Sequence, residues 1–352
     1  MKQKLRILLI VVVPLLFPRC EKYSTVEIAD ENFLQALIDR GVDTDGDGTI
    51  SFSEAADVKE LNIYYCDIFD LSGLEWFVNL ETLRCGDNEF TKIDVSRNKA
   101  LKYLDIAHNK VLHLDVSENT SLERLIAMYN PLTSLDLSKN TALRYLNTES
   151  VRLNNLDISG NTMLTEVNCW GNGLTTLDIS KNTALEQLNC CANHLLSLDL
   201  SNNPDLEILY CENNDLETLD LSENPALTGL ICSDNELTSL DISGCDQVET
   251  LYCGYNKLSV LDVSDKPLLK KLECSNNLLT SLNTSNNTEL WQLYCGYNQI
   301  TTLDISGNIK ISQLAIDHMP SLIKVCVWAM PFPVSAYTDG SPDFYFTTDC
   351  SK

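Results

Sequence analysis

The chain has 352 residues, with 25 lysines and arginines against 50 aspartates and glutamates, which gives a formal net charge of −25. Such an excess of acid repels a phosphate backbone, so the composition excludes a nucleic-acid-binding protein. The length alone would allow about two ordinary domains, and the fourteen cysteines require an explanation from their spacing.

The N-terminal residues have the pattern of an export signal. Lys2, Lys4 and Arg6 precede an apolar run at positions 7–17, which is too short to span a membrane as a helix. We therefore expect residues 1–19 to be a signal peptide and the mature chain to be secreted.

Cys20 follows the apolar run directly and resembles the lipidated cysteine of a bacterial lipoprotein signal. That resemblance implies a lipid anchor in the bacterial cell envelope, at the outer membrane or the cell surface, as the only membrane attachment. Arg19 departs from the small residues that such signals prefer before the cysteine. The alternative is that Cys20 is a plain thiol near an ordinary cleavage site.

Residues 20–79 form the predicted N-terminal cap, and they contain an acidic loop. Positions 43–54 read DTDGDGTISFSE and fit the EF-hand calcium loop at every specified place. An oxygen-only ligand set favours Ca²⁺ over a transition metal. We expect one structural Ca²⁺ that orders the cap, and the alternative is an acidic turn without an ion. The predicted ligands are Asp43, Asp45, Asp47, Thr49 through its carbonyl, Ser51 and Glu54.

The residues on both sides of this loop favour a helix-loop-helix arrangement. Phe33, Leu34, Leu37 and Ile38 make one apolar face before the loop. Residues 55–61 predict a second short helix after it.

A repeat of 21 residues fills positions 80–322, in about twelve units. Residues 185–205 read LEQLNCCANHLLSLDLSNNPD, and the general unit is LxxLxCxxNxLxxLDLSxNxx. One such turn cannot bury its own leucines, so the units must stack on one another. The alternation around Leu188 predicts a strand. Asn193 belongs to a column of ten asparagines, whose amides are expected to satisfy backbone groups of adjacent turns.

These units resemble the internalin J-like family of bacterial leucine-rich repeat proteins, whose repeats carry a cysteine in place of a core aliphatic residue. The resemblance covers residues 80–322. It implies an α/β solenoid shaped as a horseshoe, with a parallel β-sheet on the concave face and a largely irregular convex side. It also implies a role in binding rather than in catalysis. Residues 323–352 resemble the C-terminal cap of this family.

Eight cysteines occupy one repeat position, at 85, 169, 190, 211, 232, 253, 274 and 295. In-register side chains point in the same direction, so we expect buried free thiols. A zinc or disulfide ladder is the alternative. Cys326 and Cys350 lie outside this column and are the predicted disulfide. Cys66, Cys191 and Cys245 have no assigned role.

A column of ten aspartates, with Asn283 standing in once, is followed two residues later by serine in every unit. Asp and Ser bond nearby backbone amides in turns, so this column predicts a turn-forming device. A row of carboxylates that binds cations is the alternative.

Aromatic residues recur at positions expected to face outward on the concave side. The predicted ligand-binding residues are Trp170, Tyr210, Tyr252, Tyr255, Trp291, Tyr294 and Tyr297. Exposed aromatic clusters anchor protein interfaces and also stack on sugars. In YCGYN at 252–256 and 294–298, we expect glycine to leave the tyrosine rings uncovered. Tyrosine also simply suits a β-surface, which is the alternative.

Catalysis is not expected from this sequence, because its four histidines have no partnered nucleophile and no catalytic motif occurs. We predict a monomeric surface module whose concave face binds a protein ligand in adhesion or in contact with a host or another cell. The alternatives are a glycan-binding module and a scaffold without a ligand of its own.

Overall fold

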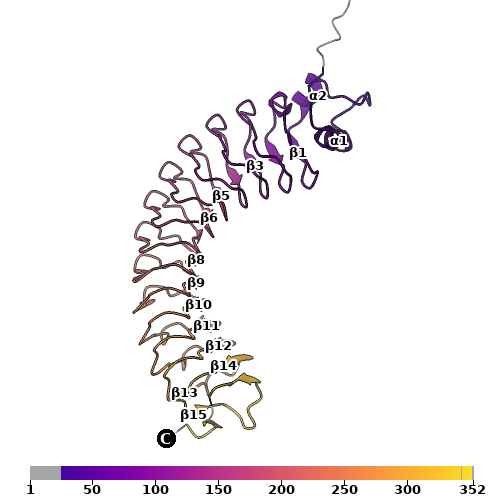
Figure 1. Ribbon diagram of the computed structural model, residues 1–352. Helices are drawn as coiled ribbons and strands as arrows, with labels where there is room; N and C mark the ends of the chain where they lie inside the picture. The colour runs from indigo at the N-terminus through magenta and orange to yellow at the C-terminus, as the bar shows by residue number, and fades with distance from the viewer. Residues whose placement is uncertain (1–24, 342, 351–352) are drawn as a thin grey trace, which may run out of the picture.

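The computed structural model describes residues 25–341 and 343–350. The chain winds into a curved solenoid whose strands lie along the inner curve (Figure 1). The predicted signal peptide (residues 1–19) and Cys20 lie outside the described residues. Within the described ranges, no helix combines the length and the apolar character needed to cross a membrane.

The concave side is one sheet of fourteen strands, in which each turn of the solenoid, here called a rung, contributes one strand. Neighbouring strands run parallel, as in the pairing of Leu188 with Leu209. The prediction of a leucine-rich repeat solenoid with a parallel concave sheet is thereby confirmed. In spatial order the strands are β1 (Glu60–Asn62), β2 (Thr82–Arg84), β3 (Tyr103–Asp105), β4 (Arg124–Ile126), β5 (Tyr145–Asn147), β6 (Glu166–Asn168), β7 (Gln187–Asn189), β8 (Ile208–Tyr210), β9 (Gly229–Ile231), β10 (Thr250–Tyr252), β11 (Lys271–Glu273), β12 (Gln292–Tyr294), β14 (Gln313–Ala315) and β16 (Ala336–Tyr337).

Two asparagine columns hold successive rungs together. Asn193 donates to the carbonyls of Cys190 in its own rung and of Cys169 in the rung before, both at 3.0 Å, and it accepts from the amide of Leu174. A second column, which the sequence analysis did not interpret, contains the fully buried Asn182. Its amide donates to the carbonyls of Ile158 and Asn161, so buried backbone groups that lack a sheet partner are satisfied.

This second column is interrupted twice, by Cys245 and then by Lys266. The buried ammonium of Lys266 donates to the carbonyl of Ser243 at 3.1 Å and to the carboxylate of Asp246 at 3.2 Å. Lys266 therefore supplies a donor where the other rungs use an amide. Cys245 has its place in this column and not in the cysteine column.

The thiols of the cysteine column are buried and free, as predicted. Burial raises the pKa of the Cys169 thiol to about 12, which keeps it protonated and unreactive. Cys191, next to Cys190, is also buried, whereas Cys66 is half-buried in the N-terminal cap.

The aspartate column forms turns on the outer part of each rung. Asp178 accepts from the amide of Ser180 at 2.9 Å, and the same contact recurs in eleven rungs, Asn283 included. These contacts are the ones that the turn-forming interpretation requires.

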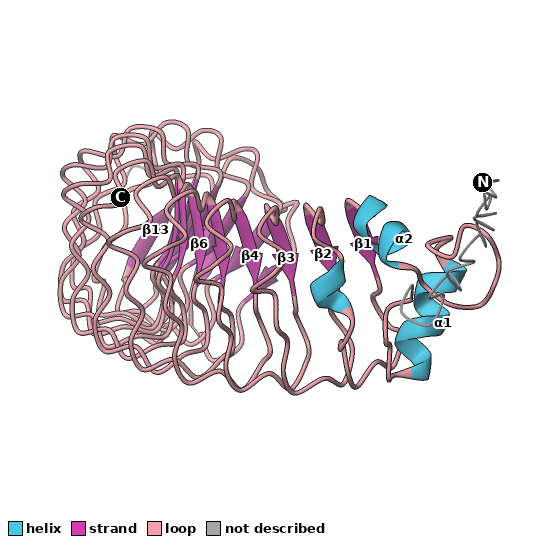
Figure 2. Ribbon diagram, turned by 90° about the horizontal axis from the view of Figure 1, so that it is seen from above, coloured by secondary structure: helices cyan, strands magenta, loops and turns pink. Residues whose placement is uncertain are grey.

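The N-terminal cap contains α1 (Glu31–Asp39), α2 (Phe52–Asp57) and the 3-10 helix η2 (Leu74–Trp76). Figure 2 shows α1 and α2 beyond the first strands of the sheet. The prediction of a helix over residues 55–61 is wrong at its end, because α2 stops at Asp57 and residues 60–62 form β1. The cap therefore already supplies one rung. It escaped the repeat pattern because Glu60 pairs with Thr82, a spacing of 22 residues instead of 21.

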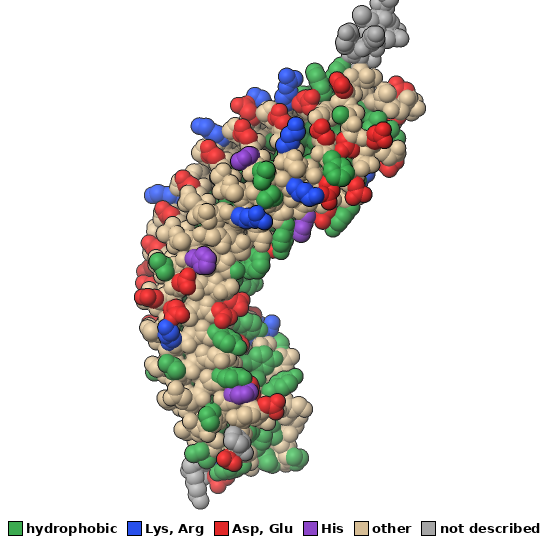
Figure 3. All heavy atoms as spheres, viewed as in Figure 1, with side chains coloured by type: hydrophobic (Ala, Val, Ile, Leu, Met, Phe, Trp, Pro, Cys, Tyr) green, Lys and Arg blue, Asp and Glu red, His purple; other side chains and the backbone are tan. Residues whose placement is uncertain are grey.

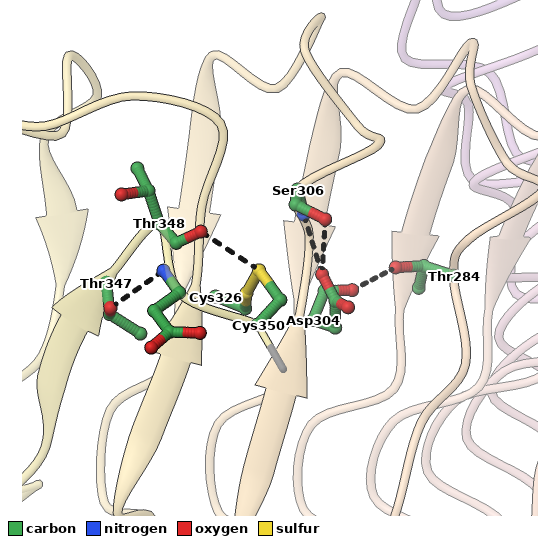
Figure 4. The surroundings of a disulfide bond; sticks show 8 residues. Thr284, Asp304, Ser306, Cys326, Thr347, Thr348 and Cys350 are labelled. Atoms are coloured by element: carbon green, nitrogen blue, oxygen red, sulfur yellow. Dashed lines mark hydrogen bonds between the residues drawn. A yellow bond between two sulfur atoms is a disulfide. The ribbon is translucent and has the colours of Figure 1, made fainter. Parts of the chain in front are cut away.

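The C-terminal cap supplies two strands of a small second sheet, β15 (Lys324–Cys326) and β17 (Tyr345–Thr347), which continues from β13 (Thr302–Asp304) of the last repeats. The structure joins Cys326 and Cys350 in a disulfide, with their Cα atoms 5.6 Å apart (Figure 4). This bond ties the last described residue to β15 and so closes the open end of the solenoid.

Candidate binding face and calcium loop

Outward side chains of the strands form straight columns along the concave sheet, because each rung repeats in register with the next. Hydrophobic side chains follow the inner curve, whereas charged side chains are spread over the outer curve (Figure 3). The concave sheet is therefore the face on which aromatic side chains are presented.

Five tyrosines gather on the C-terminal rungs and form what we call the aromatic patch: Tyr252, Tyr255, Tyr294, Tyr297 and Tyr337. Tyr252 and Tyr294 end strands β10 and β12, and both are half-buried. The amide of Gln292 donates to the Tyr252 hydroxyl at 3.2 Å, and the Tyr294 hydroxyl donates to Gln313 at 2.7 Å. The chain itself therefore fixes the orientation of these two rings.

Tyr255 and Tyr297 are exposed and stand just beyond the strands, where every rung turns with a left-handed backbone. Their φ values are 51° and 53°, and most other rungs place small or turn-forming residues there, such as Ala192 and Asn213. A bulky side chain is disfavoured in this region. Tyrosine at these two positions is thus opposed by the backbone, as it also is at Tyr65 and Tyr129, so the left-handed position indicates a functional side chain only together with the clustering of the five tyrosines.

The glycines between the paired tyrosines make room for acidic side chains, and that they leave the tyrosine rings uncovered stays a prediction. A Cβ atom on Gly254 would overlap the carboxylate of Glu273, and one on Gly296 would overlap Asp317. Each glycine thus makes room for an acid of the following rung. The Glu273 carboxylate accepts from the amides of Gly254 and Ser275, both at 3.0 Å.

The aromatic patch has acidic surroundings. Burial raises the pKa of Glu273 above its ordinary value, and burial followed by the charge of Asp234 raises the pKa of Glu212. Both carboxylates are therefore poorly solvated, and no cationic side chain is among the causes of their pKa shifts. A cationic group brought to this face would reduce the free-energy cost of keeping them ionised.

Of the remaining predicted ligand-binding residues, Tyr210 and Trp170 lie away from this patch, whereas Trp291 belongs to the rung of Tyr294. Tyr210 ends β8, two rungs before Tyr252, and is 38% exposed. Trp170 follows β6 and lies four rungs from the patch. Trp291 precedes β12 and packs under the ammonium of Lys271, 5.3 Å from the ring centre.

Two members of the same region were missed by sequence reasoning. Tyr337, on β16, is 72% exposed and belongs to the patch only because the cap adds a strand beside β14. His318 stacks on Tyr297 with ring centres 4.2 Å apart. The repeat spacing could have indicated His318, because it occupies the same repeat position as Tyr297 in the next rung.

The predicted calcium loop lies between α1 and α2. Asp43, Asp45 and Asp47 each place one carboxylate oxygen within 4.8 Å of those of the other two. The Asp43 carboxylate also accepts from the amides of Gly46 and Gly48, at 2.8 and 2.9 Å, which curls the loop around it. Three carboxylates held this closely, of which those of Asp45 and Asp47 are exposed, fit a hard divalent cation.

The Glu54 side chain closes the two ends of the loop upon each other. It accepts from the Thr44 amide at 2.6 Å and from the Ser51 amide at 2.8 Å, the latter as part of a capping box that starts α2. The Ser51 and Thr44 hydrogen bonds lower the pKa of Glu54 to about 2. Glu54 does not lie within the aspartate cluster, so bidentate ligation requires it to turn away from Thr44.

Comparison with known proteins supports these observations. No protein-family model matches the chain, and no curated protein matches its sequence. Among solved structures, the functional domain of InlJ from Listeria monocytogenes, which includes a cysteine ladder, is 33% identical with a TM-score of 0.72. The match covers 79% of this chain and 70% of that domain.

Two further structures share the fold. The internalin InlF from Listeria monocytogenes is 21% identical with a TM-score of 0.66, over 84% of this chain and 94% of that one. The ectodomain of the receptor kinase GASSHO1/SCHENGEN3 from Arabidopsis thaliana, in complex with CASPARIAN STRIP INTEGRITY FACTOR 2, is 19% identical with a TM-score of 0.63. That match covers 72% of this chain and 36% of the ectodomain.

All three are leucine-rich repeat domains, and the chain is a repeat module rather than an enzyme. The 21-residue rungs, the column of buried thiols and the identity with InlJ agree with one another. The chain belongs to the internalin J-like family of leucine-rich repeat proteins with a cysteine ladder.

Proposed function

We propose that the concave face binds a protein ligand through the aromatic patch. The observation that carries this proposal is that five tyrosines cluster on the C-terminal rungs, and that two of them, Tyr255 and Tyr297, keep exposed rings at left-handed backbone positions. A sequence selected for stability alone would place glycine or asparagine there. Clustered exposed aromatic side chains are typical anchors of protein interfaces.

The acids around the patch define the chemistry of the partner. Glu273 and Asp317 lie on the rungs of the patch, whereas Asp234 lies one rung and Glu212 two rungs before it. Lysine or arginine side chains of a ligand would pair with these carboxylates and stack on the tyrosine rings. The proposed ligand therefore presents a basic surface to the C-terminal rungs.

A protein and glycan array tests the proposal with the mature chain and the double variant Tyr255→Ala/Tyr297→Ala. The matched control is Tyr65→Ala, which removes a tyrosine at the same repeat position on the first rung, where it is 76% exposed. We expect protein hits that the double variant loses and the control keeps. Protein hits that survive in the double variant would refute the patch as the binding site.

Glycan binding is the second candidate, and the exposure of Tyr255 favours it. This ring is 56% exposed and contacts no other aromatic ring in the described residues, so a sugar has room to stack on it. Sugar hits that are lost with Tyr255→Ala would support this function over the first. An array with no hits would support a scaffold without a ligand of its own.

We further propose that the loop at residues 43–54 holds one structural Ca²⁺. Asp43, Asp45 and Asp47 would supply carboxylate oxygens, Thr49 its carbonyl, Ser51 its hydroxyl or a water, and Glu54 two oxygens. The proximity of the three aspartates supports the proposal, since their mutual repulsion favours a bound cation. The ion would order the cap next to the first rung.

Thermal unfolding with Ca²⁺ and with a chelator tests this site. We expect the melting temperature to fall on chelation in the wild-type chain and to be insensitive to calcium in Asp45→Ala/Asp47→Ala, which removes two ligand side chains. The matched control is Asp39→Ala, an exposed acid at the end of α1 whose calcium response should remain. A chelator that changes nothing would refute the structural ion.

We also propose that the protein is exported and anchored through Cys20 to the bacterial cell envelope. Labelling of producing cells with a palmitate analogue, with Cys20→Ser as the control, measures the anchor directly. An unlabelled secreted product would reduce the proposal to export alone.

A further inference from the structure

A second group of side chains on the concave face, at the opposite end from the aromatic patch, has a different chemistry. We call it the arginine–tyrosine stack, and it consists of Arg84, Tyr103, Arg124 and Tyr145. The guanidinium carbon of Arg84 lies 4.6 Å from the centre of the Tyr103 ring. That of Arg124 lies 3.3 Å from the Tyr145 ring and 5.9 Å from the Tyr103 ring. The four side chains thus alternate over rungs β2 to β5.

The guanidinium groups of this stack have unused donors. Within the described residues, neither Arg84 nor Arg124 makes a side-chain hydrogen bond or an ion pair. By contrast, Lys102 beside the sheet is paired with Glu81 at 2.7 Å. Arg97, Arg144 and Arg152 are likewise unpaired in the described residues, so Arg84 and Arg124 are distinguished by their position on tyrosine rings of the concave sheet.

The acids nearest to the stack already accept hydrogen bonds. Asp105 accepts from the hydroxyl of Tyr64 and the amide of Ala107. Glu149 accepts from the hydroxyl of Tyr129 at 2.6 Å and the amide of Asn168 at 3.0 Å. The exception is Glu166, which lies beside Tyr145 on the next strand and accepts no hydrogen bond in the described residues. Two of the acids around the stack are therefore occupied, while both guanidinium groups keep free donors.

The distribution of arginine along the chain supports a difference between the two ends. No arginine follows Arg152 in the sequence. In Figure 3, Lys and Arg side chains gather over the N-terminal third of the solenoid. The C-terminal rungs instead carry Glu212, Glu273 and Asp317 beside the aromatic patch.

We propose that the arginine–tyrosine stack is a separate subsite for an acidic segment of the protein ligand, which lies lengthwise on the concave face with its carboxylates at the N-terminal rungs. This inference rests on the proposed protein-binding function. Planar guanidinium groups held on aromatic rings present their N–H edges to carboxylates in a bidentate fashion. A sugar would need an open ring face, but Tyr103 has an arginine within 6 Å on each neighbouring rung.

The spacing of the rungs sets the spacing of the recognised carboxylates. Arg84 and Arg124 lie on strands two rungs apart, which corresponds to about 10 Å. A peptide in the polyproline II conformation advances about 3.1 Å per residue with three residues per turn, so acidic residues three positions apart lie on one face about 9 Å apart and match the two arginines.

Fluorescence anisotropy with a labelled peptide tests the subsite on the mature chain. The probe is a twelve-residue peptide with glutamate at every third position in a Ser/Thr background, and its partner peptide has glutamine instead. We expect the glutamate peptide to bind despite the net negative charge of the chain, and the glutamine peptide to bind at least about tenfold more weakly. Binding should weaken with salt.

Variants separate the stack from general electrostatics. Arg84→Gln/Arg124→Gln should weaken the glutamate peptide by about tenfold or more. The control Lys99→Gln/Lys110→Gln removes the same charge from lysines paired with Glu118 and Glu89, and it should leave binding unchanged. Equal losses in both variants, or no binding to the wild-type chain, would overturn the proposal.

Two further measurements complete the test. Circular dichroism melts of both double variants check that each is folded, so that a loss of binding reports the subsite. Polygalacturonate binding that depends on the two arginines, without peptide binding, would overturn the peptide as occupant. Tyr255→Ala/Tyr297→Ala should leave peptide binding intact, so that a failure of the aromatic patch and a failure of this subsite are seen separately.

Discussion

Replacement of Tyr255 by asparagine should cost almost no stability, although tyrosine to asparagine is a severe change. Release of the left-handed backbone, with φ at 51°, returns about 1–2 kcal/mol, because asparagine tolerates this region. The ring is 56% exposed, so it buries on the order of 90 Å² of the area that a fully buried aromatic covers. Asparagine keeps part of that buried area, so the substitution loses about 1 kcal/mol of burial free energy at about 25 cal/mol/Å².

The two terms nearly cancel, so Tyr255→Asn should unfold within about 1 kcal/mol of the wild-type chain in urea, and melt within about 3 °C of it. Tyr297→Asn also loses the stack on His318, at 4.2 Å, and should be less stable than Tyr255→Asn by about 1 kcal/mol. Both variants should lose the ligand found on the array. A loss of more than about 2 kcal/mol in Tyr255→Asn would mean that this ring supports the fold, which would refute the reasoning.

Other features of the rungs give further predictions. Asn182→Ala leaves the carbonyls of Ile158 and Asn161 unsatisfied in the core and should destabilise the chain by about 3 kcal/mol in urea unfolding; the exposed Asn202→Ala is the control. Hydrogen bonds from serine hold the pKa of Asp178 below its ordinary value of 3.8, as they do for aspartates of the other rungs. Since the folded pKa is depressed, this stabilisation is complete above pH 3.8 and is lost as the pH falls through the folded value, so the melting temperature should drop steeply below about pH 4. A melting temperature that is flat down to pH 3 would contradict this. Thiol titration of the native chain should find the cysteine column unreactive, whereas reaction of Cys190 without denaturant would show that the column is open.

The repeated part of the fold was predictable because each rung has the same pattern of apolar and polar residues. Leu188 and Cys190 recur every 21 residues, and stacking is the only way to bury them, so the solenoid and its parallel sheet follow from the spacing. The buried state of the thiols was predictable for the same reason. A single 21-residue unit does not determine which residues form the strand and face the core, whereas twelve copies of the same pattern do.

The remainder depends on contacts that the repeat pattern does not contain. The strand at Glu60 was read as a helix because the cap departs from the 21-residue spacing by one position. The alternation of Arg84, Tyr103, Arg124 and Tyr145 requires side chains of neighbouring rungs to lean toward one another. The aromatic pattern of tyrosines and tryptophans contains no information on the arginines between them. The role of Gly254 likewise depends on Glu273, nineteen residues later.

The buried thiols also bear on how the chain must be made. Eleven cysteines are free in the described part of the folded chain, and ten of them are buried. An unfolded chain in an oxidising medium would expose all of them at once, and many would be separated by only 21 residues. Random disulfides formed at that moment would prevent the rungs from stacking, so unfolding there would be irreversible. Outside a reducing compartment, the protein therefore reaches its native state only if the rungs stack and bury the thiols before the thiols are oxidised.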